Sequence, residues 1–560
     1  MKERVNGLPG LERCVFCLVL SFVVLSGTAF AQPDCGSSIT SSVTLNLDIF
    51  CRGSGLLITA DNVVLDCAGY QITYAMSEAG DGITVMGSNV TITGCIIQQG
   101  SPFPDSAGVV LTSNSNGLIK DNSITTLGEK GIAVLLTDSD FNRIIGNTMR
   151  SEGGASYSFA SFQSSNNEIV NSTLETRGNA SSAVLVQVGG NNKFTGDTIT
   201  VRGDNSYGVQ FRSTASGTIS NNAIMVASAS SSAIAVGFGA NYTSISGNSM
   251  VLRGDIDTGV LVSKGAYTSL VLNTIDASGS NVAGAFVVDS PSTQFLGNLV
   301  SADGTGVTGL LMSSSPSSNV DQNLFSVVGQ NSTAVSIRNC SDCSMSKNNV
   351  SKTGSEGWVT LLFSLTNSSI ANNTITSVGN EVALQLFNST DINITDNALS
   401  SGSSCVTVDF SSGINLFRNV LGAAAISNSR CLFVNNSILG GSPKIITSGD
   451  TQLLLNDNSY GNYWGRVSSP FFVSGVDVDN GSFSDFKPLS REYSPQRVSQ
   501  GLLSGGSGPL IAAVLLLAFA AIAAYMIRRT FERKKEGQGG SGDKGLPESG
   551  STVSEDEHSQ

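Results

Sequence analysis

The fold is decided by a short pattern that returns at a fixed interval: ISGNSM at residues 245–250, LVLNTI at 270–275 and FLGNLV at 295–300. In each copy an apolar residue stands three places before an Asn, and another stands two places after it. These Asn residues are 25 residues apart. A fixed interval of this size indicates a repeat protein built from stacked units.

The Asn position can be followed along most of the chain. From residue 122 to residue 397 it recurs every 24 to 26 residues, with Ser172 and Asp197 as substitutes, and then continues at shorter spacings through Asn419, Asn436 and Asn458. The Asn column from residue 122 to residue 397 comprises Asn122, Asn147, Asn222, Asn248, Asn273, Asn298, Asn323, Asn348, Asn373 and Asn397.

Short alternating runs between these positions, such as GVLV at residues 259–262, are typical of strands with one buried face. A unit this small buries its apolar face only by stacking on its neighbours. We therefore predict an all-β fold, a right-handed parallel β-helix solenoid of roughly 15 coils with about three strands each. A leucine-rich repeat is disfavoured because Ile and Val dominate the apolar columns and no helical face recurs.

Two columns have expected structural roles. Asn tolerates left-handed backbone, so we expect each column Asn at a sharp turn, with its amide hydrogen-bonded to the next coil. A glycine column six residues further on, which includes Gly178 and Gly203, is expected to supply a second turn.

Both ends of the chain carry targeting features. Residues 1–31 combine basic residues, an apolar run and Ala-Phe-Ala before Gln32, which predicts a signal peptide. Residues 509–527 lack charge and are followed by a basic cluster, which predicts one transmembrane helix with a cytoplasmic C-terminus rather than a buried core helix. We therefore expect a single-pass cell-membrane protein with an extracellular ectodomain at 32–489, a Ser/Gly stalk at 490–508 and a disordered cytoplasmic tail at 528–560.

The composition excludes several classes of function. The chain has 30 Lys and Arg against 43 Asp and Glu, a net charge of -13, which argues against a nucleic-acid partner. Its one histidine, His558, lies in the tail, so histidine chemistry and histidine metal sites are not expected outside the membrane. We expect no cofactor and no metal.

Eight cysteines follow the signal peptide, and an even number in an exported segment favours disulfides. Cys67 and Cys95 are separated by close to one coil, so we expect them on adjacent coils within bonding distance. The spacing of Cys340 and Cys343 is compatible with a redox or zinc motif, but a local disulfide is preferred. The expected pairs are Cys35 with Cys51, Cys67 with Cys95, Cys340 with Cys343, and Cys405 with Cys431.

Three features together resemble the right-handed β-helix proteins with PbH1 repeats, including NosD-like and carbohydrate-associated surface proteins of archaea. These are the repeat columns, the segment ITADNVVLDCAG at residues 58–69, similar to an opening coil, and GNYW at 461–464, similar to a terminal motif. The resemblance covers roughly residues 35–488. It implies N-terminal coils at about 35–100, and a fold that hosts lyases, hydrolases, adhesins and accessory factors for metal sites.

One polar stripe stands out as a candidate ligand-binding site. Arginines recur five residues after the Asn position, and acidic residues recur two residues further on. An anionic sugar or a lyase reaction would use such residues, whereas the alternative is a solvated turn with weak ion pairs. Two parts of the stripe read Arg-Gly-Asp, at residues 202–204 and 253–255. Integrin recognition is disfavoured, because the glycine column already accounts for the central Gly. The stripe consists of Arg177, Arg202, Asp204, Arg253, Asp255 and Asp257.

Aromatic residues gather where the repeat fades, and we expect residues 455–489 to form a hydrophobic cap rather than a sugar-stacking platform. The exported part also contains 13 glycosylation sequons. Their acceptors are Asn89, Asn171, Asn179, Asn241, Asn331, Asn339, Asn349, Asn367, Asn372, Asn388, Asn393, Asn435 and Asn480.

These observations favour a non-catalytic, membrane-anchored surface protein for adhesion, envelope structure or carbohydrate binding. Its expected partners are extracellular glycans or neighbouring envelope proteins. The alternatives are a polysaccharide lyase or glycoside hydrolase that acts on acidic polysaccharide, and a NosD-like accessory factor for metal-site assembly. We expect no catalytic residues and leave both alternatives open.

Overall fold

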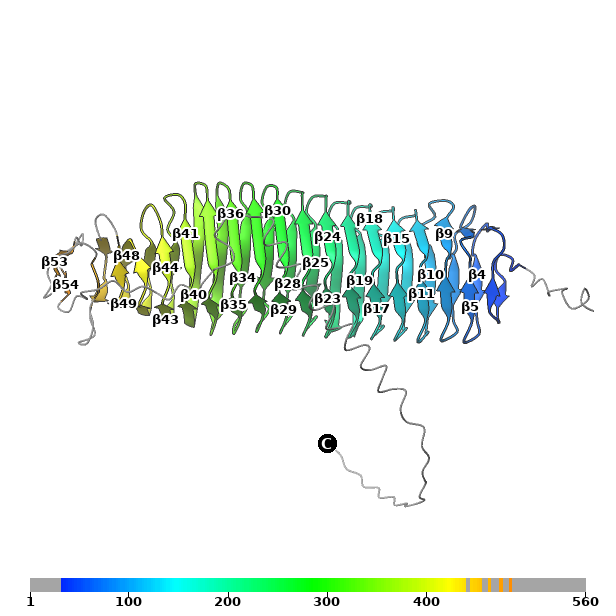
Figure 1. Ribbon diagram of the computed structural model, residues 1–560, viewed down its shortest axis with the longest axis horizontal. Coiled ribbons are helices and arrows are strands. Elements are labelled where there is room, and N and C mark those ends of the chain that lie inside the picture. Colours follow the sequence, from blue (N-terminus) through cyan, green and yellow to red (C-terminus); the bar gives the residue numbers. More distant parts are fainter. Residues whose placement is uncertain (1–31, 440–443, 456–461, 465–472, 477–482, 486–560) are drawn as a thin grey trace, which may run out of the picture. The chain divides into compact units, whose positions relative to one another are not determined.

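The computed structural model describes residues 32–439, 444–455, 462–464, 473–476 and 483–485. Every regular element in these ranges is a β-strand, and the strands form a right-handed parallel solenoid of about 16 turns (Figure 1). The predicted signal peptide, stalk, transmembrane segment and tail lie outside the described residues. Within them, no helix has the length and apolarity needed to cross a membrane.

Each coil contributes one strand to each of three parallel sheets. In sheet 1, Val109 pairs with Val134 of the next coil, and in sheet 2 Ile119 pairs with Ile144. We call the connection from sheet 1 to sheet 2 loop A, the two-residue turn from sheet 2 to sheet 3 corner B, and the connection from sheet 3 to the next coil loop C.

Sheet 1 is the row that begins each coil. Its strands are β1 (Ser38–Ile39), β4 (Leu56–Ile58), β7 (Ile83–Val85), β10 (Ala107–Thr112), β13 (Ile132–Thr137), β16 (Tyr157–Phe162), β19 (Ser182–Gly190), β22 (Tyr207–Ala215), β25 (Ser232–Gly237), β28 (Thr258–Ser263), β31 (Ala283–Val288), β34 (Thr308–Ser313), β37 (Ser332–Ser341), β40 (Gly357–Ala371), β42 (Leu384–Phe387), β45 (Val406–Asp409), β48 (Ala423–Ser427) and β51 (Lys444–Ser448).

Sheet 2 follows loop A and shares the long strand β40 with sheet 1. Its other strands are β2 (Val43–Thr44), β5 (Val64–Asp66), β8 (Thr91–Thr93), β11 (Leu118–Lys120), β14 (Arg143–Ile145), β17 (Glu168–Val170), β20 (Lys193–Thr195), β23 (Thr218–Ser220), β26 (Ser244–Ser246), β29 (Ser269–Val271), β32 (Gln294–Leu296), β35 (Asn319–Asp321), β38 (Ser344–Ser346), β43 (Thr390–Thr395), β46 (Ser412–Phe417), β49 (Arg430–Val434) and β52 (Gln452–Leu454).

Sheet 3 follows corner B. Its strands are β3 (Ile49–Phe50), β6 (Gln71–Tyr74), β9 (Ile96–Gln99), β12 (Ser123–Thr126), β15 (Thr148–Ser151), β18 (Thr173–Thr176), β21 (Thr198–Val201), β24 (Ala223–Val226), β27 (Ser249–Leu252), β30 (Thr274–Ser278), β33 (Leu299–Asp303), β36 (Leu324–Val328), β39 (Asn349–Thr353), β41 (Thr374–Ser377), β44 (Ala398–Ser400), β47 (Val420–Leu421) and β50 (Ser437–Ile438). A separate antiparallel pair consists of β53 (Val473–Val476) and β54 (Phe483–Asp485).

The core is a continuous stack of inward-facing apolar side chains. In the three-residue strands of sheet 2 the middle residue is buried, as at Ile144, Ile169 and Phe194. The rings of Phe194 and Phe211 pack 5.7 Å apart between centroids. Because every second residue points inward, equivalent apolar residues of successive coils lie directly on top of one another.

The Asn column forms a buried hydrogen-bond ladder along the axis. The Nδ2 of Asn248 donates to the Oδ1 of Asn273 (2.9 Å) and to the backbone oxygen of Ile219 (2.9 Å), and its backbone N–H donates to the same Oδ1 (3.0 Å). The expectation that the Asn itself takes left-handed backbone is wrong. That conformation belongs to the preceding residue, as at Gly247 (φ 65°) and Leu272 (φ 55°), because the Asn side chain must turn inward to cap the corner.

The last ladder member among the described residues is Asn462, which belongs to the terminal GNYW motif. Its Oδ1 accepts from the Nδ2 of Asn436 at 3.2 Å, and its own Nδ2 donates to the backbone oxygens of Phe433 and Leu455. The predicted member Asn458 lies outside the described residues. Trp464 is buried in the core, while most of the predicted aromatic cap is not described.

Asp197 occupies the ladder position of one coil, and we predict that replacing it with Asn stabilises the protein. Its Oδ1 accepts the N–H of Ser172 at 2.8 Å, but its Oδ2 has no hydrogen-bond partner among the described residues. Burial raises the pKa of Asp197 to about 7, against the lowering effect of the N–H groups of Ser172 and Thr195.

The native pKa lies above the unfolded one, so ionised Asp197 costs stability at high pH, and this cost disappears as the pH falls from 7 toward about 4. Asp197→Asn should raise the free energy of unfolding by about 2 kcal/mol at pH 8 and change it little at pH 4. Urea denaturation of the full-length protein at both pH values measures this. Equal effects at the two pH values would contradict the assignment.

Three disulfides are present among the described residues: Cys35–Cys51, Cys67–Cys95 and Cys340–Cys343. The predicted bridge between Cys405 and Cys431 is wrong, since both are buried free thiols. Cys405 stands before β45 of sheet 1, whereas Cys431 lies in β49 of sheet 2. The late coils are only 22 and 17 residues long, so a separation of 26 residues does not return the chain to the same sheet.

Candidate functional site

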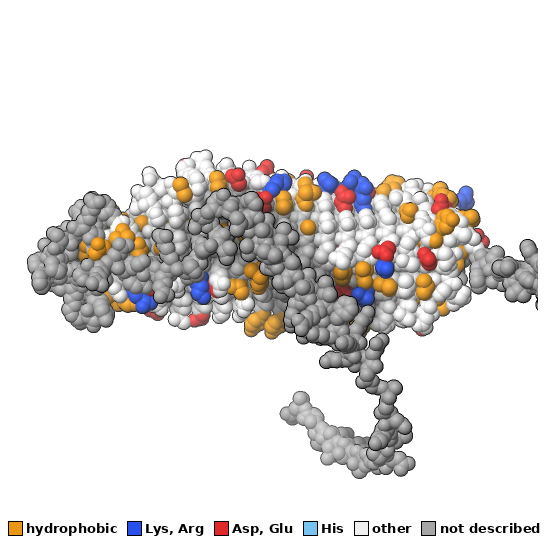
Figure 2. Space-filling view, in the orientation of Figure 1, with side chains coloured by type: hydrophobic (Ala, Val, Ile, Leu, Met, Phe, Trp, Pro, Cys, Tyr) orange, Lys and Arg blue, Asp and Glu red, His pale blue; other side chains and the backbone are white. Residues whose placement is uncertain are grey.

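The predicted Arg and Asp stripe lies in loop C, and its arginines form ion pairs within the chain. Arg177 and Arg202 contact Oε1 of Glu175 at 3.0 and 2.8 Å, and Arg253 contacts Oδ2 of Asp276 at 2.6 Å. Burial raises the pKa of Glu175, but hydrogen bonds from Arg202 and Arg177 and the charges of Arg177 and Arg150 outweigh it and lower the pKa overall. Figure 2 shows such mixed clusters of basic and acidic side chains on a surface that is otherwise mostly uncharged.

The acidic members of the stripe hold the backbone of loop C. Asp204 accepts the N–H of Ala229 (2.9 Å), and Asp255 accepts the N–H of Ser280 (2.7 Å), in each case from the following coil. Asp257 is wholly buried, and burial raises its pKa to about 6. Asp257 therefore cannot belong to a surface ligand site, contrary to expectation. It continues a buried column of loop C serines, Ser181, Ser206 and Ser231, and accepts the N–H of Ser231.

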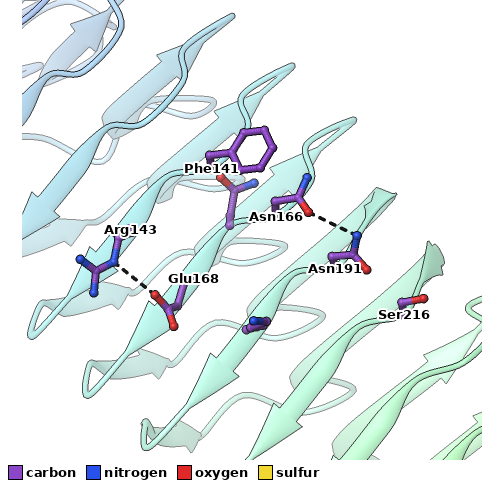
Figure 3. A pocket seen from close by; sticks show the side chains of 8 residues that line it. Phe141, Arg143, Asn166, Glu168, Asn191 and Ser216 are labelled. Atoms are coloured by element: carbon purple, nitrogen blue, oxygen red, sulfur yellow. Dashed lines mark hydrogen bonds and ion pairs between the residues drawn. The ribbon is translucent and has the colours of Figure 1, made fainter. Parts of the chain in front are cut away.

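A different surface offers a better site. A groove of about 510 Å³ runs beside loop A across the outer face of sheet 2 (Figure 3). Its charged residues come from β14, β17 and β20, and its other residues come from the loop A segments of successive coils. It is lined by Phe141, Arg143, Asn166, Asn167, Glu168, Asn191, Lys193 and Ser216.

The charged side of the groove is a row of three side chains. The Nε of Arg143 contacts Oε2 of Glu168 at 3.2 Å, and Lys193 is the register partner of Glu168 on the next strand. Lys193 is exposed and forms no ion pair with the described residues. The row therefore carries two cations and one carboxylate, with the ammonium of Lys193 free to bind an anionic group.

The opposite side of the groove is built on left-handed backbone. Phe141, Asn166 and Asn191 have φ of 59°, 60° and 57°, and occupy equivalent positions in three successive coils. The Nδ2 of Asn191 donates to Oδ1 of Asn166 at 3.2 Å, and the ring of Phe141, 55% exposed, stands at the end of the row (Figure 3). An aromatic face, amides and a free cation suit a polar, ring-containing anion.

This groove was not predicted from the sequence, although its columns are periodic. Arg143, Glu168 and Lys193 are 25 residues apart, as are Phe141, Asn166 and Asn191. The residue type changes from coil to coil in both columns, so no repeated motif marks them as a binding site. Which sheet face and which loop meet at a groove depends on the cross-section of the coil, and the repeat length does not specify that.

A second groove, of about 870 Å³, lies over loop C near residues 354–357 and 377–381. Its lining residue Glu381, 9% exposed, has its Oε1 3.6 Å from the Nζ of Lys352, whose side chain is 0% exposed. Lys352 also donates to the backbone oxygen of Gly354 (3.3 Å), and Ser377 donates to Oε2 of Glu381 (2.9 Å). The charges are thus satisfied within the chain, and no group of three metal-ligating side chains occurs among the described residues.

The sequon asparagines lie on the solenoid surface where they are described. Asn241, Asn349 and Asn435 are half-buried, and Asn480 lies outside the described residues. The exposed acceptors are Asn89, Asn171, Asn179, Asn331, Asn339, Asn367, Asn372, Asn388 and Asn393.

Three wound parallel sheets with a buried amide ladder define the chain as a right-handed parallel β-helix protein. Residues 45–199 match the family model described as a right handed beta helix region. No curated protein matches the sequence at a significant level.

Among solved structures, the chain is similar to DFA-IIIase from Arthrobacter chlorophenolicus A6 without its lid, with 11% identity, a TM-score of 0.35, and coverage of 45% of this chain and 70% of that one. It is also similar to the mannuronan C-5 epimerase AlgE4 A-module of Azotobacter vinelandii, with 13% identity and a TM-score of 0.34. That match covers 77% of this chain and 91% of the other. A third similar structure is PfbA, a surface adhesin of Streptococcus pneumoniae, with 10% identity and a TM-score of 0.28. That match covers 57% of this chain and 82% of the other.

Proposed function

We propose that this protein is a non-catalytic, membrane-anchored cell-surface β-helix that binds extracellular carbohydrate in the groove of Figure 3. The observation that carries the proposal is the pairing of an exposed aromatic ring with a free cation and stacked amides. The two cations and one carboxylate of the row favour an acidic sugar over a neutral one.

The proposed location follows from the sequence. A signal peptide at 1–31 and an apolar segment at 509–527 followed by basic residues support a single-pass protein with its solenoid outside the cell. In that position the groove would face extracellular glycans or the neighbouring envelope.

The test is binding of uronate oligosaccharides to the full-length protein in detergent, measured by isothermal titration calorimetry. Lys193→Glu reverses the free cation of the groove and should weaken binding about tenfold or more. Lys130→Glu, the same change at an exposed site in loop C, is the matched control and should leave the affinity unchanged. Absence of binding by the parent protein, or equal effects of the two changes, would refute the proposal.

The lyase or hydrolase alternative is tested on the same samples. Appearance of unsaturated or reducing ends during incubation, and their loss on substituting Arg202 and Arg253 together, would establish it. The ion pairs of these arginines with Glu175 and Asp276 favour the binding function instead, because each guanidinium is already matched by a carboxylate.

A further inference from the structure

Two tyrosines on loop A form an exposed stacked pair. The rings of Tyr242 and Tyr267 lie 4.8 Å apart between centroids with an interplanar angle of 3°. They are 60% and 53% exposed, and Phe238, 70% exposed, lies in the same loop A segment as Tyr242. No described part of the chain covers these rings.

The tyrosines belong to the same column as the loop A side of the groove. The backbone N–H of Asn191 donates to Ala215, that of Ser216 to Asn241, and that of Tyr242 to Ala266, so each position sits directly over its equivalent in the next coil. Figure 3 shows the first members of this column in succession. From residue 141 to residue 267 the column comprises Phe141, Asn166, Asn191, Ser216, Tyr242 and Tyr267.

Aromatic residues are an unfavourable choice at these positions. Tyr242 and Tyr267 both have φ of 57°, a left-handed conformation that Gly and Asn adopt most readily. Other coils of this column use Asn166, Asn191 or Gly413. The fold alone therefore requires no ring here, and the tyrosines accept both backbone strain and exposed apolar surface, a combination that favours a binding role.

We propose that a linear acidic polysaccharide lies along the solenoid axis on this column, with a uronate unit at Lys193 and sugar rings packed against the exposed surfaces of the Tyr242 and Tyr267 pair. This inference rests on the function proposed above and adds the chain length of the ligand. Five coil steps from Phe141 to Tyr267, at about 4.8 Å each, span about 24 Å. Short oligosaccharides fill only the charged groove, whereas longer ones also reach the tyrosines.

The experiment measures the affinity of the full-length protein for oligogalacturonates and oligomannuronates from dimer to octamer. In the parent protein affinity should rise with length until the oligomer reaches the tyrosines. The double variant Tyr242→Ala/Tyr267→Ala should weaken binding of the octamer about tenfold and leave the trimer unchanged. Tyr242→Phe/Tyr267→Phe keeps the rings and should retain octamer affinity.

The outcomes separate the two proposals. Trimer binding that depends on Lys193 but octamer binding that ignores both tyrosines overturns the extended track and leaves the groove function standing. No uronate binding at any length refutes the groove function itself. Retained trimer affinity in the alanine variant also shows that the solenoid has folded, so a loss confined to the octamer reports the tyrosines alone.

Discussion

Lys352→Met should destabilise the solenoid by about 3 to 5 kcal/mol, the range found when one partner of a buried ion pair is removed. Lys352 lies in β39 at a core position, where its register partner on the preceding coil is Val327. Met preserves the volume but leaves the carboxylate of Glu381 buried without its cation. Burial raises the pKa of Glu381, but its own backbone N–H, Ser377 and Lys352 outweigh this and lower the pKa overall.

This lowered pKa sets the pH range of the effect. The ionised pair stabilises the native protein above the unfolded pKa of Glu, about 4.3, and the contribution is lost as the pH falls through the lower native pKa. Chemical denaturation at pH 7 and pH 4 should therefore show a smaller effect of Lys352→Met at the lower pH.

Two further variants make the test specific. Lys352→Met combined with Glu381→Met removes both charges and should recover most of the lost stability, because a well-packed apolar pair often replaces a buried ion pair at no cost. Lys120→Met removes the cation of an exposed pair with Asp121 and should cost less than about 1 kcal/mol. A harmless Lys352→Met, or no recovery in the double variant, would contradict the assigned burial of the pair.

Gly178→Ala should lower stability by at least about 3 kcal/mol, above the usual cost of adding one methyl group to a packed core. A Cβ at Gly178 would lie 1.7 Å from the backbone oxygen of Gly153 in the preceding coil. Neither group can move without breaking the coil spacing. Thermal unfolding and hydrogen exchange of the flanking strands β18 and β19 measure the loss.

Gly154→Ala, in loop C of the preceding coil, is the matched control. Its Cβ would meet only the backbone oxygen of Asn179, at an ordinary 3.7 Å, so the change should be neutral or slightly stabilising. Similar losses from the two variants would show that alanine disturbs loop C in general, and would remove the close stacking as the cause.

The glycine column illustrates how much of the fold could be predicted. The interval between these glycines could be predicted from the sequence. The turn conformation that was expected to require glycine occurs only in later coils, as at Gly304 (φ 143°) and Gly329 (φ 152°). At Gly153, Gly178 and Gly203 the requirement is the close approach of the preceding coil. The close contact between a glycine and the backbone of the preceding coil is not visible in the sequence, because it joins two segments that are 25 residues apart.

The candidate site shows a similar division. Arg177, Arg202 and Asp204 stood out in the sequence because Arg and Asp recur in their columns, yet their side chains bind other groups of the solenoid. Lys193 was overlooked because its column reads Arg143, Glu168, Lys193 and carries no constant residue. Periodicity detects side chains that the fold needs in every coil, whereas a binding site is formed by the coils that differ.

The sequence by itself determined the parallel solenoid, its strands and its buried amide ladder, because each coil repeats the same inward pattern and no other packing buries it. Only the tertiary structure decided that Asn462 follows Asn436 in the ladder, that Cys405 and Cys431 stay apart, and that a groove opens beside loop A. These features depend on where a residue falls around the coil, which the three-sheet cross-section and the changing coil length set.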